Sequence, residues 1–138
     1  MKIFLDTSAF VKLYVREART DEVLGLLAHA DTLVLSVICL PEIISSLSRL
    51  CREGSLENRD YLAIKSKILA HMEDILIVQI TPEVVLSSTE LLEGNQLRAM
   101  DAIHIACAKT LGVDLFVSAD HRQLRAADQC GLKTADVS

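Results

Sequence analysis

The sequence predicts a three-layer α/β fold in which a mainly parallel sheet of four to five strands is flanked by helices. Two observations carry this prediction. Short runs rich in Val, Ile and Leu alternate with longer helical patterns along the whole chain, an order typical of parallel sheets. The apolar runs are nearly continuous, which indicates strands that are buried on both faces of the sheet.

Five runs are candidate strands. Residues 2–5 (KIFL) are short and apolar, and the sequence DTS follows them directly. Residues 32–38, 75–80 and 114–119 are similar runs, and residues 132–137 form a weaker fifth candidate. Each run has a length that is typical of strands in globular proteins.

Helical patterns fill the gaps between these strands, and several of their ends carry start signals. Thr20 is a candidate N-cap of the second helix, Pro41 stands at the favoured first position of the third, and Thr81-Pro82 begins the fifth. No repeat or linker interrupts the order, so we predict one domain over residues 1–138. The predicted helices span residues 8–17, 20–29, 41–52, 57–72, 82–93, 98–110 and 120–130.

The composition excludes several classes of protein. A chain of 138 residues that is 51% hydrophobic can bury a core, which must be aliphatic because aromatic residues make up only 4%. No apolar run approaches the length of a membrane-spanning helix, and Asp6 interrupts the N-terminal run, so we expect no signal peptide and a cytoplasmic location. The four cysteines are widely spaced, which favours reduced, packed thiols over zinc ligands or disulfides.

Four acidic residues fall where a parallel sheet would bring them together. Asp6 ends the first strand, Glu42 begins the helix after the second, Asp101 lies early in an apolar helix, and Asp120 follows the fourth strand. The helix from Asp101 runs about 14 Å and the strand that returns runs about 20 Å, so Asp101 and Asp120 finish at the same end. Ligands of open α/β sheets bind outside the carboxyl ends of the strands. We therefore expect the four acids to share one cleft.

Such a cluster of carboxylates requires protonation or a cation. Two unit charges about 4 Å apart repel by about 4 kcal/mol at an effective dielectric constant of about 20. Oxygen ligands without a convincing cluster of His or Cys favour Mg²⁺ or Mn²⁺ over zinc. The predicted chemistry is metal-assisted hydrolysis of a phosphodiester bond.

Each acid also has a structural interpretation. Asp6 and Asp120 suit helix N-caps, and Glu42 suits the first turn of a helix. Asp101 is the hardest to explain structurally, because a helix that is apolar on nearly all sides is buried and a buried Asp needs a partner. His104 follows Asp101 by three residues, and we interpret it as a core histidine rather than a general base.

Four motifs occur in an order that resembles PIN-domain ribonucleases, in particular the VapC-type toxins of toxin–antitoxin pairs. They are FLDTSAF (4–10), PEI (41–43), LRAMDAIHIACA (97–108) and LFVSADHRQL (115–124). The resemblance implies that Asp6, Glu42, Asp101 and Asp120 form an acidic metal site, with Thr7, Ser8 and Ser118 beside it. It also implies RNA cleavage with Mg²⁺ or Mn²⁺, a homodimer, and a small antitoxin that inhibits the cleft.

Other interpretations stay open at this point. The net charge of −5 argues weakly against a nucleic-acid partner, although Arg98, His121 and Arg122 are candidates for contacts to RNA phosphates. The alternatives are a PIN ribonuclease that processes RNA without an antitoxin and a PIN-like module that binds proteins without catalysis. A phosphatase of the haloacid-dehalogenase type is disfavoured, because Ser8 stands where such an enzyme needs a second acid.

Overall fold

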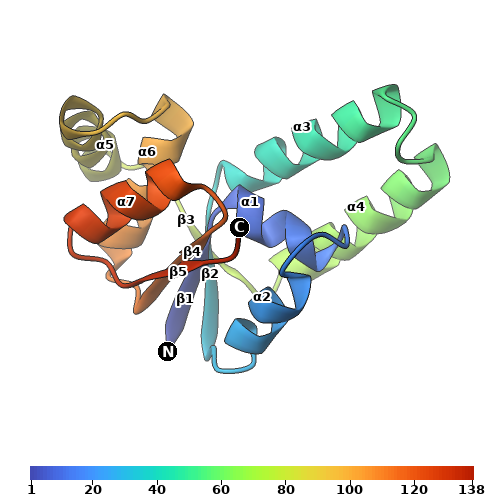
Figure 1. Cartoon of the computed structure of the whole chain (residues 1–138), viewed down its shortest axis with the longest axis horizontal. Helices are drawn as coiled ribbons and strands as arrows, with labels where there is room; N and C mark the ends of the chain where they lie inside the picture. The colour runs from blue at the N-terminus through green and yellow to red at the C-terminus, as the bar shows by residue number, and fades with distance from the viewer.

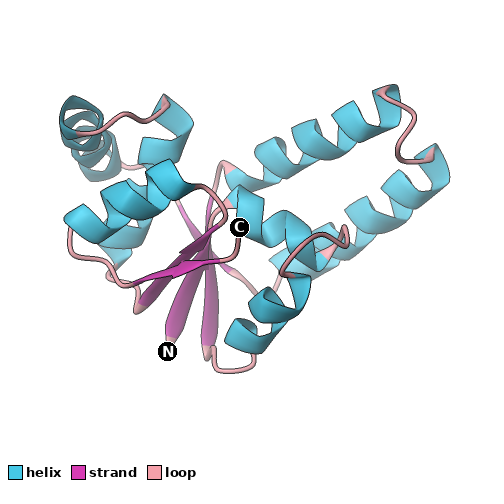
Figure 2. Ribbon diagram, viewed as in Figure 1, coloured by secondary structure: helices cyan, strands magenta, loops and turns pink.

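A computed structural model describes all 138 residues, and its centre is a sheet of five strands that pair in parallel (Figures 1 and 2). The strand order is β3-β2-β1-β4-β5, so β1 lies in the middle. This arrangement confirms the predicted parallel sheet. The strands are β1 (Lys2–Leu5), β2 (Thr32–Ser36), β3 (Leu76–Val78), β4 (Leu115–Ser118) and β5 (Thr134–Asp136).

Helices cover both faces of the sheet and complete the three layers that the sequence predicted. In Figure 1, α1 to α4 lie on one side of the sheet and α5 to α7 on the other. A pair of long helices, α3 and α4, projects away from the sheet. The helices are α1 (Thr7–Phe10), the 3-10 helix η1 (Val11–Leu13), α2 (Thr20–Leu27), α3 (Cys39–Arg52), α4 (Asn58–Met72), α5 (Pro82–Gly94), α6 (Ala99–Leu111) and α7 (His121–Gln129).

Successive side chains of the central strands enter two separate cores. Phe4 of β1 packs with α5, α6 and α7, while its neighbours Ile3 and Leu5 pack with α1 to α4. The same alternation places Phe116 and Val117 of β4 in different cores. Because side chains alternate across a strand, near-continuous apolar strands are what a sheet covered on both faces requires.

The first helix is much shorter than the predicted span of 8–17. The α-helix ends at Phe10, and a single 3-10 turn follows it to Leu13. Lys12 is buried, and its ammonium donates to the carbonyl of Ala18 at 2.8 Å and pairs with Glu17 at 3.2 Å. The chain folds back on itself to make these contacts, which explains why local helix propensity does not extend the helix.

Two predicted helix starts are also corrected. Arg19, with a φ of 64°, precedes α2 as the N-cap, while the Thr20 hydroxyl bonds the backbone of Glu17 instead of capping the helix. Helix α3 begins at Cys39, so Pro41 is its third residue rather than its first. Pro41 is tolerated there because the first N–H groups of a helix have no partner within it. Thr81 caps α5 as predicted.

None of the helices is both long enough and apolar enough to cross a lipid bilayer. All four cysteines are free thiols, as the sequence predicted.

Candidate active site

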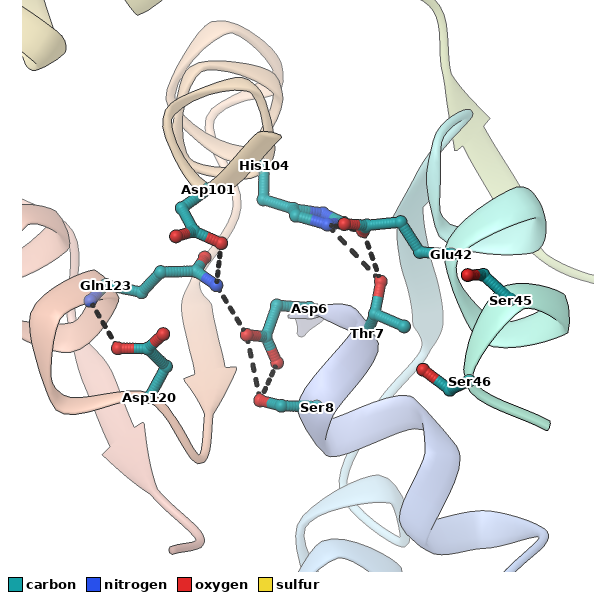
Figure 3. Close-up of a pocket in the computed structure, with 10 residues that line it drawn as sticks. All are labelled: Asp6, Thr7, Ser8, Glu42, Ser45, Ser46, Asp101, His104, Asp120 and Gln123. Carbon is teal, nitrogen blue, oxygen red and sulfur yellow. Dashed lines mark hydrogen bonds and ion pairs between the residues drawn. The ribbon is translucent and has the colours of Figure 1, made fainter. Parts of the chain in front are cut away.

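A polar cleft of about 340 Å³ lies at the carboxyl ends of the central strands, and it contains all four predicted acids. No hydrophobic side chain lines it. Figure 3 shows that its lining comes from segments that are far apart in the sequence. The lining residues are Asp6, Thr7, Ser8, Glu42, Ser45, Ser46, Asp101, His104, Asp120 and Gln123.

Asp6 lies at the floor of this cleft, where β1 ends and α1 begins. It is 1% exposed, and its carboxylate caps α1 by accepting from the backbone N–H of Ala9 at 3.0 Å. It also accepts from the hydroxyls of Ser8 and Ser118, each at 2.7 Å, and from the amide of Gln123 at 2.8 Å. Burial raises the pKa of Asp6, and the charge of His104, together with the hydrogen bonds from Ser118, Ser8 and Ala9, offsets only part of that effect.

Asp101 and Asp120 lie on one side of the cleft, and Asp6 lies between them and Glu42 (Figure 3). Asp120 caps α7 by accepting from the backbone N–H groups of Arg122 at 2.8 Å and Gln123 at 3.3 Å. Burial raises the pKa of Asp101, and the negative charge of Asp120 raises it further. These two carboxylates therefore repel one another across the cleft.

Glu42 occupies the opposite side of the cleft with a different set of partners. Its Oε1 accepts from Nε2 of His104 at 2.5 Å and from the Thr7 hydroxyl at 2.7 Å. Burial alone would raise the pKa of Glu42, but the hydrogen bonds from His104 and Thr7 outweigh it and lower the pKa. His104 is 1% exposed and packs edge-on against Phe4. It is therefore buried, as predicted, but it also lines the cleft and bonds Glu42, and its Nδ1 has no hydrogen-bond partner.

The remaining predicted residues divide into those at the cleft and those outside its lining. Thr7 and Ser8 line the cleft, while Ser118 is fully buried beneath Asp6. Arg98 and Arg122 are exposed and are not lining residues. His121 contacts the C-terminal segment instead, through Asp136 at 3.1 Å and Ser138 at 3.0 Å.

Sequence reasoning missed three residues of the cleft: Gln123, Ser45 and Ser46. Gln123 lies three residues after the N-cap Asp120, where a side chain can reach back toward the start of the helix. It also shares the buried stripe of α7 with Leu124 and Ala127, and a Gln on such a stripe is a signal that was available. Ser45 lies one turn after Glu42 and is recognisable only once α3 is known to face the cleft.

The oxygen-rich lining fits a hard divalent cation in its chemistry. Carboxylates and hydroxyls are the ligands that Mg²⁺ and Mn²⁺ prefer, and the mutual repulsion of Asp101 and Asp120 is the kind that a cation relieves. As the side chains lie, however, no three His, Cys, Asp or Glu residues are grouped closely enough to hold one ion. The amide of Gln123 lies between Asp6 and Asp101, and Glu42 is turned toward His104 (Figure 3).

The cysteine nearest to the cleft does not supply a nucleophile. Burial raises the pKa of Cys39 to about 12, so its thiol stays protonated at neutral pH.

Comparison with known proteins identifies the family. The family model described as the PIN domain matches residues 3–129. The chain belongs to the PIN-domain family. Two relatives from Mycobacterium tuberculosis carry the name ribonuclease. VapC47 of strain CDC 1551 is 30% identical, with 96% of this chain and 95% of the relative covered. VapC46 of strain H37Rv is 34% identical, with 94% and 93% covered.

Solved structures support the PIN fold. VapBC2 from Rickettsia felis, bound to a DNA fragment from its promoter, aligns over 100% of both chains with a TM-score of 0.71 and 17% identity. A toxin–antitoxin complex from Klebsiella pneumoniae aligns over 88% of this chain and 89% of that chain, with a TM-score of 0.66 and 15% identity. The PIN-like fold that the sequence predicted is confirmed.

We predict that Asp101→Asn stabilises the metal-free protein at neutral pH. The pKa of Asp101 is higher in the folded protein than its ordinary value of 3.8. Asp101 therefore contributes to the stability of the folded protein when it is protonated, below pH 3.8, and this contribution is lost as the pH rises through the folded-state pKa. The variant removes this loss, so its melting temperature should exceed that of the wild type by a few degrees at pH 7, and the gain should vanish toward pH 3.8. Thermal unfolding in EDTA at several pH values measures it. Asp128→Asn, at an exposed position on α7, is the control, and an unfolded Asp101→Asn would contradict the prediction.

We predict the opposite effect for Glu42→Gln. Because the pKa of Glu42 is lowered in the folded protein, its contribution to stability is present above the ordinary value of 4.5 and is lost as the pH falls through the lowered value. The variant should lose about 1–2 kcal/mol of unfolding free energy at pH 7, and the difference should narrow in acid. Urea denaturation measures it. The control is Glu83→Gln, which removes an exposed acid from the first turn of α5. If Glu83→Gln lost as much unfolding free energy as Glu42→Gln, the hydrogen bond from His104 would not be the cause.

Proposed function

We propose that this protein is a metal-dependent endoribonuclease that hydrolyses RNA phosphodiester bonds in the acidic cleft and acts as the toxin of a toxin–antitoxin pair. Membership of a family whose relatives are named ribonucleases supports the class of enzyme, a hydrolase that acts on RNA. The convergence of four carboxylates from remote segments on one polar cleft of a PIN fold is the observation that carries the site assignment.

Asp6, Asp101 and Asp120 are the proposed ligands of Mg²⁺, for which Mn²⁺ can substitute. The amide of Gln123 links Asp6 to Asp101 (Figure 3), and Asp101 and Asp120 repel one another in the metal-free protein. The sequence predicted Glu42 as a ligand of the same ion; because its Oε1 already accepts from His104 and Thr7, we propose instead that Glu42 acts from the opposite side of the cleft. A bound divalent ion would supply a Lewis acid that stabilises the negative charge developing on the phosphate and on the leaving oxygen.

The protein's own residues have separate tasks in this proposal. Ser8 and Ser118 donate to Asp6 and hold its two oxygens in place. His104 and Thr7 hold Glu42 as an ionised carboxylate, which suits it to orient the attacking water and accept its proton. Arg98, His121 and Arg122 are proposed to meet the backbone phosphates of RNA outside the cleft.

The wider biological assignment has independent support. Structures similar in fold are VapBC assemblies and a toxin–antitoxin complex, which supports a small antitoxin as the partner. We further propose a homodimer, a single nuclease domain over residues 1–138, and action in the cytoplasm, where RNA is present and where the four free thiols stay reduced.

We predict that the wild-type protein cleaves a mixed RNA pool with Mg²⁺ or Mn²⁺ and that excess EDTA stops the cleavage. Asp6→Asn and Asp101→Asn should each lower the rate by at least about 100-fold, as expected when one group that stabilises the transition state is lost. Gel analysis of labelled RNA measures the rate, and Asp128→Asn should cleave like the wild type.

Two results would contradict this assignment. Cleavage that persists in EDTA would exclude the metal mechanism. A folded protein that binds Mn²⁺ in calorimetry yet cleaves no RNA would favour the protein-binding module.

The proposed homodimer is tested separately, by analytical ultracentrifugation of the same sample.

We predict that the gene of a small antitoxin lies directly beside the gene of this protein. When the two are expressed together, the small protein should co-purify with this chain and suppress its RNA cleavage at a one-to-one ratio. Degrading the small protein with a protease that spares this chain should restore the cleavage. A neighbouring gene product that co-purifies without inhibition, or the absence of any such gene, would favour a PIN ribonuclease that processes RNA without an antitoxin.

A further inference from the structure

Gln123 joins two of the proposed metal ligands through a single nitrogen atom. Its Nε2 donates to Oδ2 of Asp6 at 2.8 Å and to Oδ1 of Asp101 at 3.3 Å. An amide nitrogen carries two hydrogens, so it can donate to both carboxylates at once. Figure 3 shows this amide between the two acids.

No basic side chain performs this task. None of the ion pairs in the structure includes Asp6, Asp101 or Asp120. The amide hydrogens of Gln123 therefore provide the direct link that brings Asp6 and Asp101 together, although the amide is neutral.

The other end of the same amide is left without a partner. Gln123 is 4% exposed, and its Oε1 is buried with no hydrogen bond. A buried carbonyl without a partner is unfavourable. In the reversed orientation of the amide, Oε1 would face two carboxylates. That orientation is less favourable still, because none of these oxygens carries a hydrogen to donate. The only hydrogen bonds of this amide are thus those to the carboxylates of Asp6 and Asp101.

We propose that Gln123 takes the place of the cation in the metal-free protein and that metal binding displaces its amide from between the two carboxylates. Gln123 is then a positioning residue rather than a metal ligand. It keeps Asp6 and Asp101 close together before the ion arrives, and it makes the ion compete with two hydrogen bonds. This inference rests on the proposed function, because it assumes that the ion binds to Asp6 and Asp101.

The test is to replace the amide by an apolar side chain of similar size and to measure metal binding without RNA. Gln123→Met keeps an unbranched chain and removes both hydrogen bonds. Metal-free Gln123→Met should melt at a lower temperature than the wild type. It should also bind Mn²⁺ about tenfold more tightly in calorimetry, which corresponds to about 1.4 kcal/mol, because no bridge has to be broken.

The saturating thermal shift provides a second measurement that does not depend on activity. Because ligand binding stabilises the folded state by an amount that grows with the logarithm of the affinity, Mn²⁺ should raise the melting temperature of Gln123→Met by more than that of the wild type. Gln129→Met, at an exposed position of the same helix, is the matched control and should behave as the wild type in both measurements. Gln123→Leu replaces Gln123→Met if the latter does not fold.

The possible results separate this inference from the proposed function. If the wild type binds Mn²⁺ and Gln123→Met binds it more weakly, Oε1 of Gln123 is a ligand and the inference is wrong. Unchanged affinity also overturns it. If the folded wild type binds no Mn²⁺ at millimolar concentration, the metal site itself is wrong and the inference falls with it.

Discussion

The burial of one carboxylate, Asp6, is the constraint on which the rest of the cleft depends. Asp6 ends the central strand and accepts hydrogen bonds from four neutral groups, which belong to Ser8, Ala9, Ser118 and Gln123. Burying a charge is costly unless its lone pairs are satisfied. The hydrogen bonds that satisfy Asp6 connect the end of β1 to α1, to the end of β4 and to the first turn of α7. The need to satisfy this one buried carboxylate therefore fixes how these elements meet at the cleft.

The cleft has two sides that differ in electrostatic character. On one side, Asp101 is destabilised by burial and by Asp120. On the other side, hydrogen bonds from His104 and Thr7 stabilise the charge of Glu42. Only the first side has a physical reason to accept a cation, whereas Glu42 is already satisfied and oriented. This difference supports ligand roles for the three aspartates and a water-orienting role for Glu42.

Local sequence patterns were sufficient for the parallel sheet, for the start of α5 at Thr81, and for the gathering of four acids at one end of the sheet. They failed where a distant contact decides the outcome. The first helix stops early because Lys12 reaches back to Ala18. The pairing of Glu42 with His104 depends on α3 and α6 meeting at the cleft, and the bridge by Gln123 depends on how α7 is rotated. Neither the order of strands nor the rotation of a helix can be read from periodicity.

The structural and functional interpretations of the four acids turn out to be compatible. Glu42 and Asp101 lie in the first turns of α3 and α6, and Asp120 caps α7. The amino-terminal end of a helix carries a partial positive charge, so three helices stabilise these carboxylates, of which only Glu42 also pairs directly with a basic side chain, that of His104. That stabilisation is limited to the first turn and leaves Asp101 with a raised pKa. The helix ends therefore lower the cost of gathering the acids but do not neutralise them, and the remaining negative charge is what gives a divalent ion its affinity for the cleft.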